Sequence, residues 1–570
     1  MIGSGRHFDY TMNSTMTELI VELHGARLMA GGHQLIPENC LPGDCVDVAG
    51  HFLSREHSFT LGLVVGVTES PRSATVSFPM FGPACPSRAT IHEVYAAVGE
   101  RLVLELYAHG SIVCRRVEGP EARADARLLT ALYRQALVID GCWPHMPGFG
   151  PHHYTREGVT DHTDLDTFTI DPVSTVDYDD ALSVGKDGTV YIHIVDIMAT
   201  MHRIDLPRVR CLGSSLYLAN EHTEHLLDPE TMEAITLAEG LLRAVITVAV
   251  TLDPEGSVAR YEVYRSTIRV KRRFTYEEAA TLLDEHPGLA ALHQLATLRS
   301  STVSYKIDMP SVRLEMNGIG EPIEARLEST TDAAHTLVST AMILCNLVIS
   351  YHLKARGLDL PNRFHAPLRG IPVGERGDLD DLTATFCLLK KMARAEYSVD
   401  RRGHFGLGLT DYVHFTSPMR RYADMVTHMI LAGAAFTRAD LEVEVATLNR
   451  RAAFVRSLQR FYTRTKVDRW LLARGSESHD VVITSVAPAG VQWFMPSVLL
   501  NGFCHVSLLR PARRWNFNPE TGSLYADLWR ISVGDRLIGS VSGPGQITLT
   551  VRSIEGPHAP APLRSTPVSD

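Results

Sequence analysis

Four aspartates lie within ten consecutive residues, and this spacing constrains the chain more than any other feature. They are Asp171, Asp177, Asp179 and Asp180. Carboxylates packed so closely repel one another and raise each other's pKa. A fold keeps such a cluster when a polyvalent cation neutralises it, and oxygen ligands in this number suit magnesium, with manganese as the alternative. The cluster therefore predicts a divalent metal and a phosphate-bearing substrate.

The local sequence leaves one alternative to a catalytic metal site open. Asp171 is expected to end a short strand (167–171), and the other three aspartates to lie on the following loop. A calcium-binding EF-hand loop counted from Asp177 would need Gly at its sixth position and Glu at its twelfth, where this chain has Leu182 and Gly188. That reading fails, whereas a solvated acidic loop stays open.

Composition indicates a multidomain protein without a membrane-spanning segment. The chain has 570 residues, 45% hydrophobic and 21% charged, which is ordinary for globular domains and too long for a single core. No uninterrupted apolar run reaches about 18 residues, and residues 1–10 lack a basic region followed by an apolar core. The nine cysteines form no CxxC pair, which favours reduced thiols and a cytoplasmic location, with a nuclear one as the alternative.

The net charge of −10 argues against a protein that coats nucleic acid without specificity. It does not exclude a local basic channel, because the electrostatic field that a ligand meets is local.

The expected fold class is multidomain α+β, with a mixed α/β region between small β-barrels. Gly- and Pro-punctuated strands suggest OB-like modules at residues 17–70 and 71–118, and another at 476–555. Residues 119–154 read as a linker helix and loop, 155–475 as the α/β region, and 556–570 as a tail expected to be disordered.

Within the α/β region the pattern predicts a hairpin followed by long helices. The hairpin strands are expected at 243–252 and 258–270, and Thr275 and Glu278 have the spacing of a capping box. The predicted helices cover 333–355, 380–394, 418–435 and 438–473.

A second constellation follows His404-Phe-Gly-Leu-Gly-Leu, in the stretch from His414 to Met425. Ser417 suits a helix N-cap and Pro418 the first helical position, which would place Arg420 and Arg421 in the first turn. Arginines there make sense if an anion docks at the helix N-terminus. Asp424, four residues after Arg420, could orient it. A local ion pair on a surface helix is the alternative.

These two segments resemble the ribonuclease II/ribonuclease R family, the RNB exoribonucleases. The resemblance rests on the Asp-x5-Asp-x-Asp-Asp loop and on the HFGLxL…HFTSPxRRYxD segment, which occur in the family's order. The segment Arg272-Arg-Phe-Thr-Tyr-Glu-Glu is also similar to the family's. The resemblance extends over about 17–555 and implies an RNB catalytic domain, two cold-shock-like OB modules before it and one RNA-binding OB module after it.

The resemblance implies a hydrolase that degrades single-stranded RNA processively from the 3′ end to nucleoside 5′-monophosphates. The four aspartates match the family's ligands for two metal ions, and Asp179 is the one whose loss should stop chemistry while leaving binding. Asp179, Asp180 and Arg420 are the implied catalytic residues, with Arg420 on the scissile phosphate. Tyr217 matches an aromatic that stacks on a base, with ordinary packing as its alternative.

Further resemblance-based predictions concern binding and partners. Glu396 matches a glutamate near the last nucleotide, and Arg421 is expected to contact substrate beside Arg420. The implied partner is single-stranded RNA, with no membrane and with unidentified RNA-decay proteins. A monomer is the default.

Some positions depart from the family pattern. Ser339 and Thr340 stand where the family often has two glutamates, and Arg464 where a late glutamate is common. The second aromatic of the base clamp is either Phe364 or, in the better alignment, replaced by Leu368, which leaves the end-product length open. The alternative function is a catalytically impaired RNA-binding protein that retains the scaffold. A metal-dependent phosphatase or DNA nuclease is disfavoured by the three predicted RNA-type barrels.

Overall fold

The computed structural model describes strand residues within 19–118, residues 129–130, and residues 158–550 apart from 219–221, 301–308, 318–319, 330, 368–381, 476, 528 and 544–545. The chain divides into two compact units, residues 1–139 and 140–570. The predicted tail, Leu368 and nearly all of the predicted linker lie outside the described residues.

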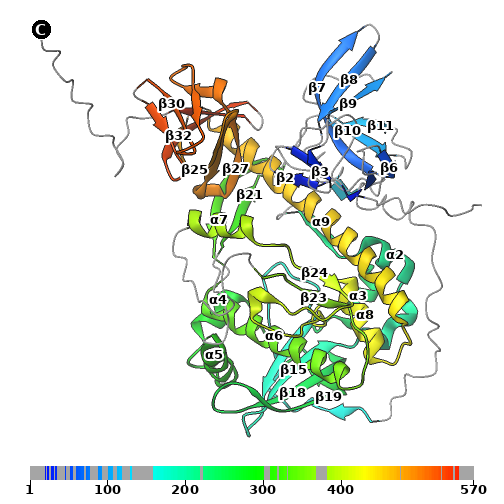
Figure 1. The fold of residues 1–570 in the computed structure, drawn as a ribbon. Helices are drawn as coiled ribbons and strands as arrows, with labels where there is room; N and C mark the ends of the chain where they lie inside the picture. Colours follow the sequence, from blue (N-terminus) through cyan, green and yellow to red (C-terminus); the bar gives the residue numbers. More distant parts are fainter. Residues whose placement is uncertain are drawn as a thin grey trace, which may run out of the picture. The chain divides into compact units, whose positions relative to one another are not determined.

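The first unit contains short strands in three sheets (Figure 1), as its sequence predicts. The strands are β1 (Leu19–Ile20), β5 (Cys45–Val46) and β6 (Phe52–Ser54); β2 (Glu22–His24), β3 (Arg27–Ala30) and β4 (His33–Gln34); and β11 (Ile112–Glu118), β10 (Arg101–Leu106), β7 (Phe59–Glu69), β8 (Arg72–Ser77) and β9 (Arg88–His92). Because β7 pairs with both β8 and β10, the hairpin of residues 59–77 crosses the boundary expected at residue 70.

A seven-stranded sheet forms the base of the second unit. Its order is β12 (Thr160–Asp161), β19 (Val258–Arg269), β18 (Leu242–Leu252), β15 (Val190–Val195), β14 (Asp180–Val184), β13 (Phe168–Ile170) and β20 (Arg272–Phe274). The predicted hairpin is confirmed as β18 and β19. The short strand before Asp171 is confirmed as β13, whereas Asp180 begins β14 instead of lying on the loop.

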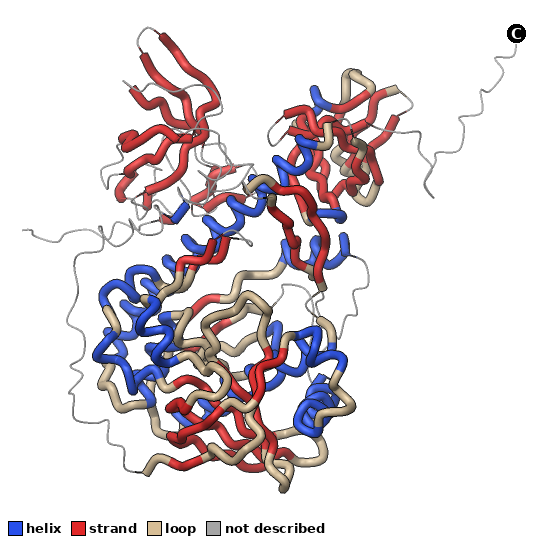
Figure 2. Tube along the Cα trace, turned by 180° about the vertical axis from the view of Figure 1, so that it is seen from behind, coloured by secondary structure: helices blue, strands red, loops and turns tan. Residues whose placement is uncertain are grey.

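Several helices pack against this sheet (Figure 2), and the described helices include the predicted long ones. They are α2 (Leu206–Leu212), α3 (Pro229–Ile235), α4 (Tyr276–Thr281), α5 (Pro287–Ser300), α6 (Ala333–Lys354), α7 (Leu382–Lys391), α8 (Tyr422–Leu431) and α9 (Arg438–Ala473), with 3-10 turns η2 (Ile197–Arg203) and η3 (Phe405–Leu407). The predicted capping box is confirmed: the Glu278 backbone N–H donates to Thr275 Oγ1 at 3.1 Å, and Glu278 Oε2 accepts from the Thr275 N–H at 2.8 Å.

Two short two-stranded sheets belong to the α/β region. They pair β16 (Leu216–Leu218) with β17 (His222–Glu224), and β23 (Asn362–Phe364) with β24 (Glu396–Ser398). Each carries a residue that the sequence singles out, namely Tyr217 on β16 and Glu396 on β24.

Helix α6 is long and apolar enough to cross a membrane by length and composition alone, and no other described helix is. Of its most apolar 18-residue window, 61% is buried inside the fold. Helix α6 contacts α4, α5 and strands β15, β18 and β19, which is the environment of a core helix.

The prediction that a helix starts at Pro418 is wrong. Residues 418–420 form a turn, and α8 begins at Tyr422. The Ser417 carbonyl accepts from the Arg421 backbone N–H at 3.0 Å, while the Tyr422 N–H donates to the Gly213 carbonyl at 2.9 Å. Since this hydrogen bond holds Tyr422 against the chain after α2, the stretch before α8 is fixed by tertiary contacts and not by a helix cap.

Helix α9 joins the α/β region to a C-terminal β-domain. The six-stranded sheet there has the order β27 (Leu500–His505), β26 (Gly490–Met495), β25 (His479–Ala487), β32 (Arg536–Gly543), β33 (Gln546–Thr550) and β28 (Leu509–Arg510). Beside it lie β29 (Asn516–Asn518), β30 (Ser523–Ala526), β31 (Trp529–Ile531), η4 (Pro496–Val498) and η5 (Val506–Leu508).

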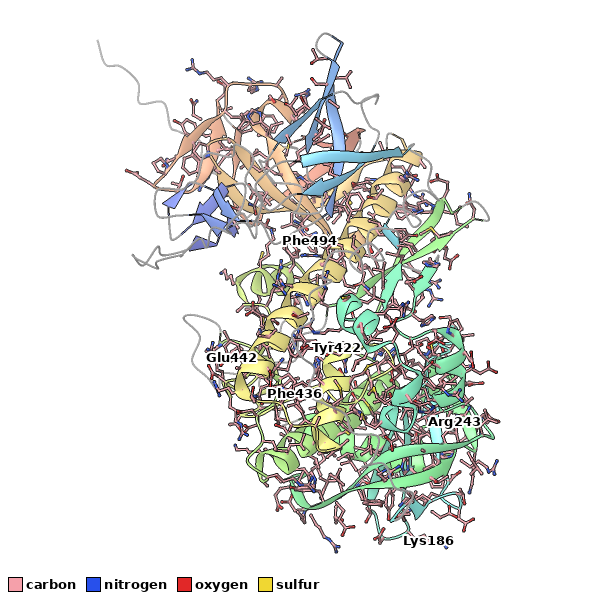
Figure 3. All side chains as sticks on the ribbon, turned by 90° about the vertical axis from the view of Figure 1, so that its right-hand side faces the viewer. Lys186, Arg243, Tyr422, Phe436, Glu442 and Phe494 are labelled. Atoms are coloured by element: carbon pink, nitrogen blue, oxygen red, sulfur yellow. The ribbon has the colours of Figure 1, made fainter. Side chains whose placement is uncertain are left out.

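The hydrophobic core of this C-terminal domain includes residues from earlier in the chain. Trp493 is packed with Val467 and Leu471 of α9 and with Leu314 of the hairpin formed by β21 (Ser311–Met316) and β22 (Pro322–Glu328). Phe494, labelled in Figure 3, stacks on Phe386 of α7 with ring centroids 4.0 Å apart. The expected boundary at residue 476 therefore separates residues that share one core.

A buried histidine inside the seven-stranded sheet makes the fold sensitive to acid. The ring nitrogens of His193 are hydrogen-bonded to the hydroxyls of Ser183 and Thr247, each at 2.8 Å. Burial, assisted by the nearby charge of His162, lowers the pKa of His193 to about 3. At pH values between these two pKa values, His193 is neutral in the folded protein and protonated in the unfolded chain. The free energy of unfolding is therefore highest above about pH 6.5 and decreases as the pH falls below that value.

Replacing this histidine should flatten the acid response. Between pH 7 and pH 5 the free energy of unfolding of the wild-type protein should fall by about 2 kcal/mol more than that of His193→Gln, since each unit of pH below the unfolded pKa costs about 1.4 kcal/mol. Glutamine can still pair with both hydroxyls. Urea unfolding at the two pH values measures the difference, with exposed His202→Gln as the control. Equal pH responses in wild type and His193→Gln would contradict the assignment.

Candidate active site

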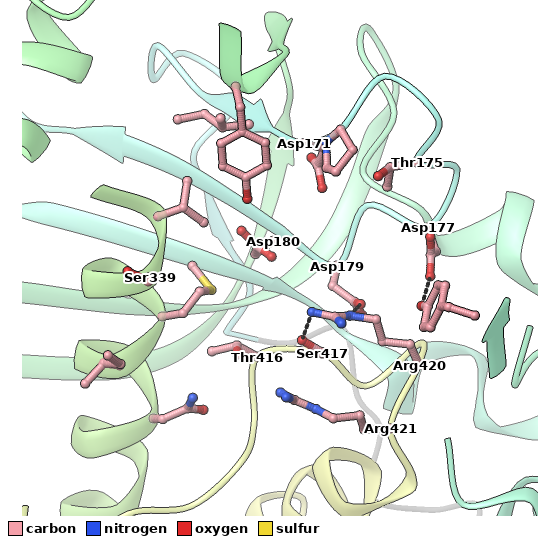
Figure 4. A pocket seen from close by; sticks show the side chains of 18 of the residues that line it. Asp171, Thr175, Asp177, Asp179, Asp180, Ser339, Thr416, Ser417, Arg420 and Arg421 are labelled. Atoms are coloured by element: carbon pink, nitrogen blue, oxygen red, sulfur yellow. Dashed lines mark hydrogen bonds and ion pairs between the residues drawn. The ribbon is translucent and has the colours of Figure 1, made fainter. Parts of the chain in front are cut away.

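A cavity of about 480 Å³ lies where the end of β13, the start of β14, helix α6 and the segment before α8 meet. All four aspartates predicted from the sequence line it, together with Arg420, Arg421 and Tyr217 (Figure 4). Its other lining residues are Ile170, Pro172, Thr175, Tyr276, Val338, Ser339, Met342, Ile343, Asn346, Tyr412, Thr416 and Ser417. The two sequence constellations, about 240 residues apart, therefore meet in one place.

Two of the aspartates, Asp171 and Asp180, have raised pKa values in the cavity. Burial and, to a smaller extent, the neighbouring Asp180 carboxylate raise the pKa of Asp171 to about 8, against the opposing charge of Arg273. Burial likewise raises the pKa of Asp180 to about 6, although Arg420 and Arg421 oppose the shift. The cavity thus disfavours full ionisation of its carboxyl groups unless a cation neutralises them.

Asp179 is the most buried of the four aspartates. Its Oδ1 accepts a hydrogen bond from the Met419 backbone N–H at 2.8 Å, and its Oδ2 lies 3.5 Å from Arg420 Nε. Oδ2 is buried and makes no hydrogen bond. Burial raises the pKa of Asp179 well above the usual aspartate value, despite the opposing Arg420. This oxygen is an unsatisfied acceptor inside the cavity, which a fold normally avoids.

Asp177 is held by an aromatic hydroxyl. Tyr217 donates from its hydroxyl to Asp177 Oδ2 at 3.2 Å, and His225 Nδ1 lies 3.8 Å from the same oxygen. Tyr217 is 38% exposed, so part of this residue remains accessible in the cavity. Burial, and then the charge of Asp177, raises the pKa of the Tyr217 hydroxyl, which keeps it a hydrogen-bond donor.

The four carboxylates share the cavity without converging on one point. Among the described residues, no three His, Cys, Asp or Glu side chains are grouped closely enough to hold a single ion as they stand. The donor set still fits a hard divalent cation in its chemistry, because all four groups are carboxylates and one buried oxygen, Asp179 Oδ2, accepts no hydrogen bond.

Arg420 lies at the mouth of the aspartate cluster with its side chain 44% exposed. Its Nη2 donates to Ser417 Oγ at 3.1 Å, and its backbone carbonyl accepts from the Ser215 N–H at 3.0 Å. One end of the guanidinium therefore faces Asp179 and Ser417. Among the described residues no carboxylate pairs with it through two hydrogen bonds, so donors remain for an incoming anion.

Arg421 is engaged differently from its neighbour, and the expected pairing of Asp424 with Arg420 is wrong. Arg421 donates from Nε and Nη2 to the two oxygens of Asp424, both at 2.8 Å. Asp424 is fully buried and also accepts from the Ser417 backbone N–H at 2.8 Å. Because α8 starts later than expected, Asp424 reaches Arg421, which becomes a support of the loop and not a free anion receptor.

The sequence reasoning missed one residue that lines the cavity, Tyr276, and one that lies beside the aspartate loop, Arg273. Strand β20 pairs in parallel with β13, which brings Arg273 beside the loop after Asp171, where its Nη2 donates to the carbonyls of Pro172 and Val173 at 2.9 Å. Tyr276, at the start of α4, lines the cavity and stacks on His335 with ring centroids 3.7 Å apart. Both lie in the segment Arg272–Glu278 quoted for the resemblance, which was the available signal.

The remaining singled-out residues lie elsewhere. Glu396 is exposed on β24 opposite Phe364 and is not part of the cavity lining. Ser339 lines the cavity, but its hydroxyl donates back to the Thr336 carbonyl at 3.0 Å. Arg464 donates to the Asn501 carbonyl at 2.7 Å and so links α9 to the C-terminal domain. Of the three positions where the resemblance implies glutamates, only Ser339 lines the cavity.

Comparison with known proteins identifies the class to which this fold and cavity belong. The RNB domain family matches residues 159–436, which contain all four aspartates and both arginines. The chain therefore contains an RNB domain, and it is similar to ribonuclease R proteins, which are RNB exoribonucleases.

Particular relatives agree with this assignment. Ribonuclease R of Chlamydia muridarum is 25% identical over 526 residues, covering 79% of this chain and 74% of the relative. Ribonuclease R of Mycoplasma genitalium in complex with ribose-methylated single-stranded RNA has the same fold, with a TM-score of 0.71 at 17% identity over 94% of this chain and 100% of that one. Yeast Ssd1, a pseudonuclease, is also similar in fold, with a TM-score of 0.64 at 15% identity over 89% and 81% of the two chains.

Proposed function

We propose that this protein hydrolyses single-stranded RNA processively from the 3′ end in a metal-dependent reaction and releases nucleoside 5′-monophosphates. The observation that carries the proposal is the cavity in which four aspartates face Arg420, an arginine with donors left for a phosphate. The RNA in the similar ribonuclease R structure supports RNA as the substrate.

We propose that Asp171, Asp177, Asp179 and Asp180 hold two magnesium ions, with manganese as the alternative. Two observations support this proposal: Asp179 Oδ2 is buried without a hydrogen bond, and the pKa values of Asp171 and Asp180 are raised. A cation would coordinate the oxygen and neutralise the charge of the carboxylates. Divalent ions in such a site make a bound water more acidic and stabilise charge on the departing oxygen.

The protein's own groups would position the substrate. Arg420 donates to the non-bridging oxygens of the scissile phosphate and stabilises the charge that grows there during displacement. Arg421, fixed by Asp424, keeps the preceding loop in place and so aims Arg420. Tyr217 offers its ring to a base near the 3′ end.

Removing the ring of Tyr217 should lengthen the shortest product. Base stacking on an aromatic side chain is worth about 1–3 kcal/mol, so Tyr217→Ala should release strands that the wild type still shortens. Tyr217→Phe keeps the ring and loses only the hydroxyl bond to Asp177, so its product length should match wild type. Gel electrophoresis of the limit products measures this. If the limit product of Tyr217→Ala has the same length as that of the wild type, Tyr217 has only a packing role.

We infer that the C-terminal domain is an OB-type barrel that binds RNA. Strands β25, β26 and β27 form a meander, β32 and β33 add to the other side of β25, and β27 contacts β33, as a five-stranded Greek-key barrel requires. The same module type is proposed for the two N-terminal segments, within the domain limits that the sequence suggests.

Linear and circular RNA of one sequence would test the proposed function. An exoribonuclease needs a free end, so the linear strand should disappear and the circle should persist. Loss of the circle at the same rate would mean internal cleavage. If both persist while RNA is bound, the chain is a scaffold like a pseudonuclease, which the missing carboxylates at Ser339 and Thr340 would then explain.

A further inference from the structure

A histidine next to the aspartate cluster has a buried ring nitrogen that makes no hydrogen bond. His225 Nδ1 is enclosed and has no hydrogen-bond partner among the described residues, although it lies 3.8 Å from Asp177 Oδ2. A buried polar atom of this kind costs free energy, and a fold normally pairs it. His225 is not one of the residues that line the cavity, so it approaches Asp177 from outside the space in which a metal ion would lie.

The backbone around His225 is held on both sides. Strand β17, which pairs with β16, ends at Glu224, immediately before His225. Both backbone groups of the following residue, Leu226, are tethered: its N–H donates to Ser215 Oγ at 2.9 Å, and its carbonyl accepts from Arg208 Nη1 at 2.6 Å. The place of the His225 ring beside Asp177 is therefore set by the fold of this segment.

The backbone around Asp177 is fixed as well, by the hydroxyl of Thr236. This hydroxyl donates to the Val176 carbonyl at 3.0 Å and accepts from the Tyr178 N–H at 2.9 Å. Because the chain is held on both sides of Asp177, a rotation of its side chain is the movement left to bring the carboxylate closer to His225.

Two side chains converge on the same oxygen of Asp177. The Tyr217 hydroxyl donates to Oδ2 at 3.2 Å (Figure 4), and among the described residues it is the only hydrogen-bond donor to Asp177. The Asp177 side chain is 7% exposed, so water supplies few further donors. A second donor at Oδ2 would hold the carboxylate by one oxygen and leave Oδ1 for a metal ion. Carboxylates that bind metals are commonly held in this way by groups that do not touch the metal.

We infer that His225 is a positioning residue for the metal ion that Asp177 would hold, with its Nδ1–H donating to Asp177 Oδ2 in the metal-bound protein. This inference rests on the proposed function. It satisfies the buried nitrogen of His225 and gives the nearly buried carboxylate a second donor. Because a carboxylate oxygen only accepts hydrogen bonds, the assignment requires a proton on Nδ1 of the ring.

Three substitutions of His225 separate the hydrogen bond from packing. Asparagine places an amide N–H near the position of Nδ1, glutamine places it one bond further out, and leucine fills the space without a donor. Affinity for manganese alone is measured at one pH from the loss of the electron paramagnetic resonance signal of the free ion. Since removing a group that supports a metal ligand costs about 10- to 100-fold in metal affinity, His225→Leu and His225→Gln should bind manganese at least about tenfold more weakly. His225→Asn should bind it nearly as tightly as the wild type.

The metal-free protein supplies the control for folding. In EDTA the three variants should melt close to the wild type, because Nδ1 makes no hydrogen bond that could be lost. His222→Leu is the matched control for affinity, since its side chain is 41% exposed on the same strand, β17. This variant should bind manganese as the wild type does.

The outcomes separate this inference from the proposed function. Equal affinities of wild type and His225→Leu, or equal losses in His225→Asn and His225→Leu, would overturn the inference, while manganese binding and RNA cleavage by the wild type uphold the function. A nitrogen coupling to bound manganese in pulsed electron paramagnetic resonance, absent from His225→Leu, would make the ring a ligand and also overturn the positioning role. A wild-type protein that takes up no manganese would overturn both the proposed metal site and this inference.

Discussion

Asp179→Asn should lower the rate of RNA cleavage at least about 1,000-fold while RNA binding persists. A loss of about 4 kcal/mol of transition-state stabilisation gives this factor, and a metal site that loses a carboxylate is expected to lose that much. Asparagine keeps the oxygen that accepts from the Met419 N–H, so the loop before α8 should stay in place. RNA affinity should be equal or higher, because one negative charge facing the phosphates is gone.

The design of this experiment depends on showing that the fold is intact. Single-turnover cleavage and equilibrium binding are measured on the same protein, with melting temperature as the check. The variant should melt no lower than wild type in EDTA, because the substitution removes a buried carboxylate whose charged form is disfavoured. Asp187→Asn, on an exposed turn, is the matched control. Joint loss of binding and cleavage would count against the assigned role of Asp179.

Arg420→Ala should lower kcat by about 100- to 1,000-fold, the usual cost of deleting one donor to a charge that develops in the transition state. Arg420→Lys should recover only part of the rate, since an ammonium group retains the charge and loses the bidentate geometry. Stability should change little, because Arg420 is partly exposed and its pairs with Asp179 and Ser417 are long. Steady-state kinetics on a 5′-labelled strand would measure the effect.

The neighbouring variant Arg421→Ala is expected to affect stability, in contrast to Arg420→Ala. Arg421→Ala leaves the fully buried Asp424 without its partner, and an unpaired buried charge costs about 3–5 kcal/mol. This variant should therefore melt far below wild type, whereas Arg420→Ala should not. Exposed Arg402→Ala controls for loss of positive charge in general. A near-normal rate for Arg420→Ala would remove that residue from the site.

Much of the fold could be predicted where local patterns dominate. Helix α9 begins and ends where the sequence places it, at Arg438 and Ala473, because a capping box at Thr437 and Asp440 precedes a long periodic stretch. Helix α6 and the β18–β19 hairpin follow the predicted ranges within a residue or two. The resemblance of the aspartate loop and of the Arg420 segment to the RNB family also implies that they form one site, and the structure brings them together in one cavity.

The errors arise where tertiary contacts decide. The turn at 418–420 is held by the chain near Gly213, a partner that sequence spacing does not reveal, and so Asp424 was assigned to Arg420 in place of Arg421. Arg273 reaches the aspartate loop only because β20 joins the sheet in parallel beside β13. Glu396 was placed by alignment alone, and its strand carries it away from the cavity lining.

The most direct test of the central claim is a time course of cleavage of 5′-labelled single-stranded RNA with magnesium and with EDTA, in which the released products are identified. We expect the labelled strand to collapse to a short 5′ fragment as nucleoside 5′-monophosphates accumulate, only when the metal is present. Cleavage that continues in EDTA, or RNA that stays intact with both magnesium and manganese, would contradict the account of the four aspartates as a catalytic metal site.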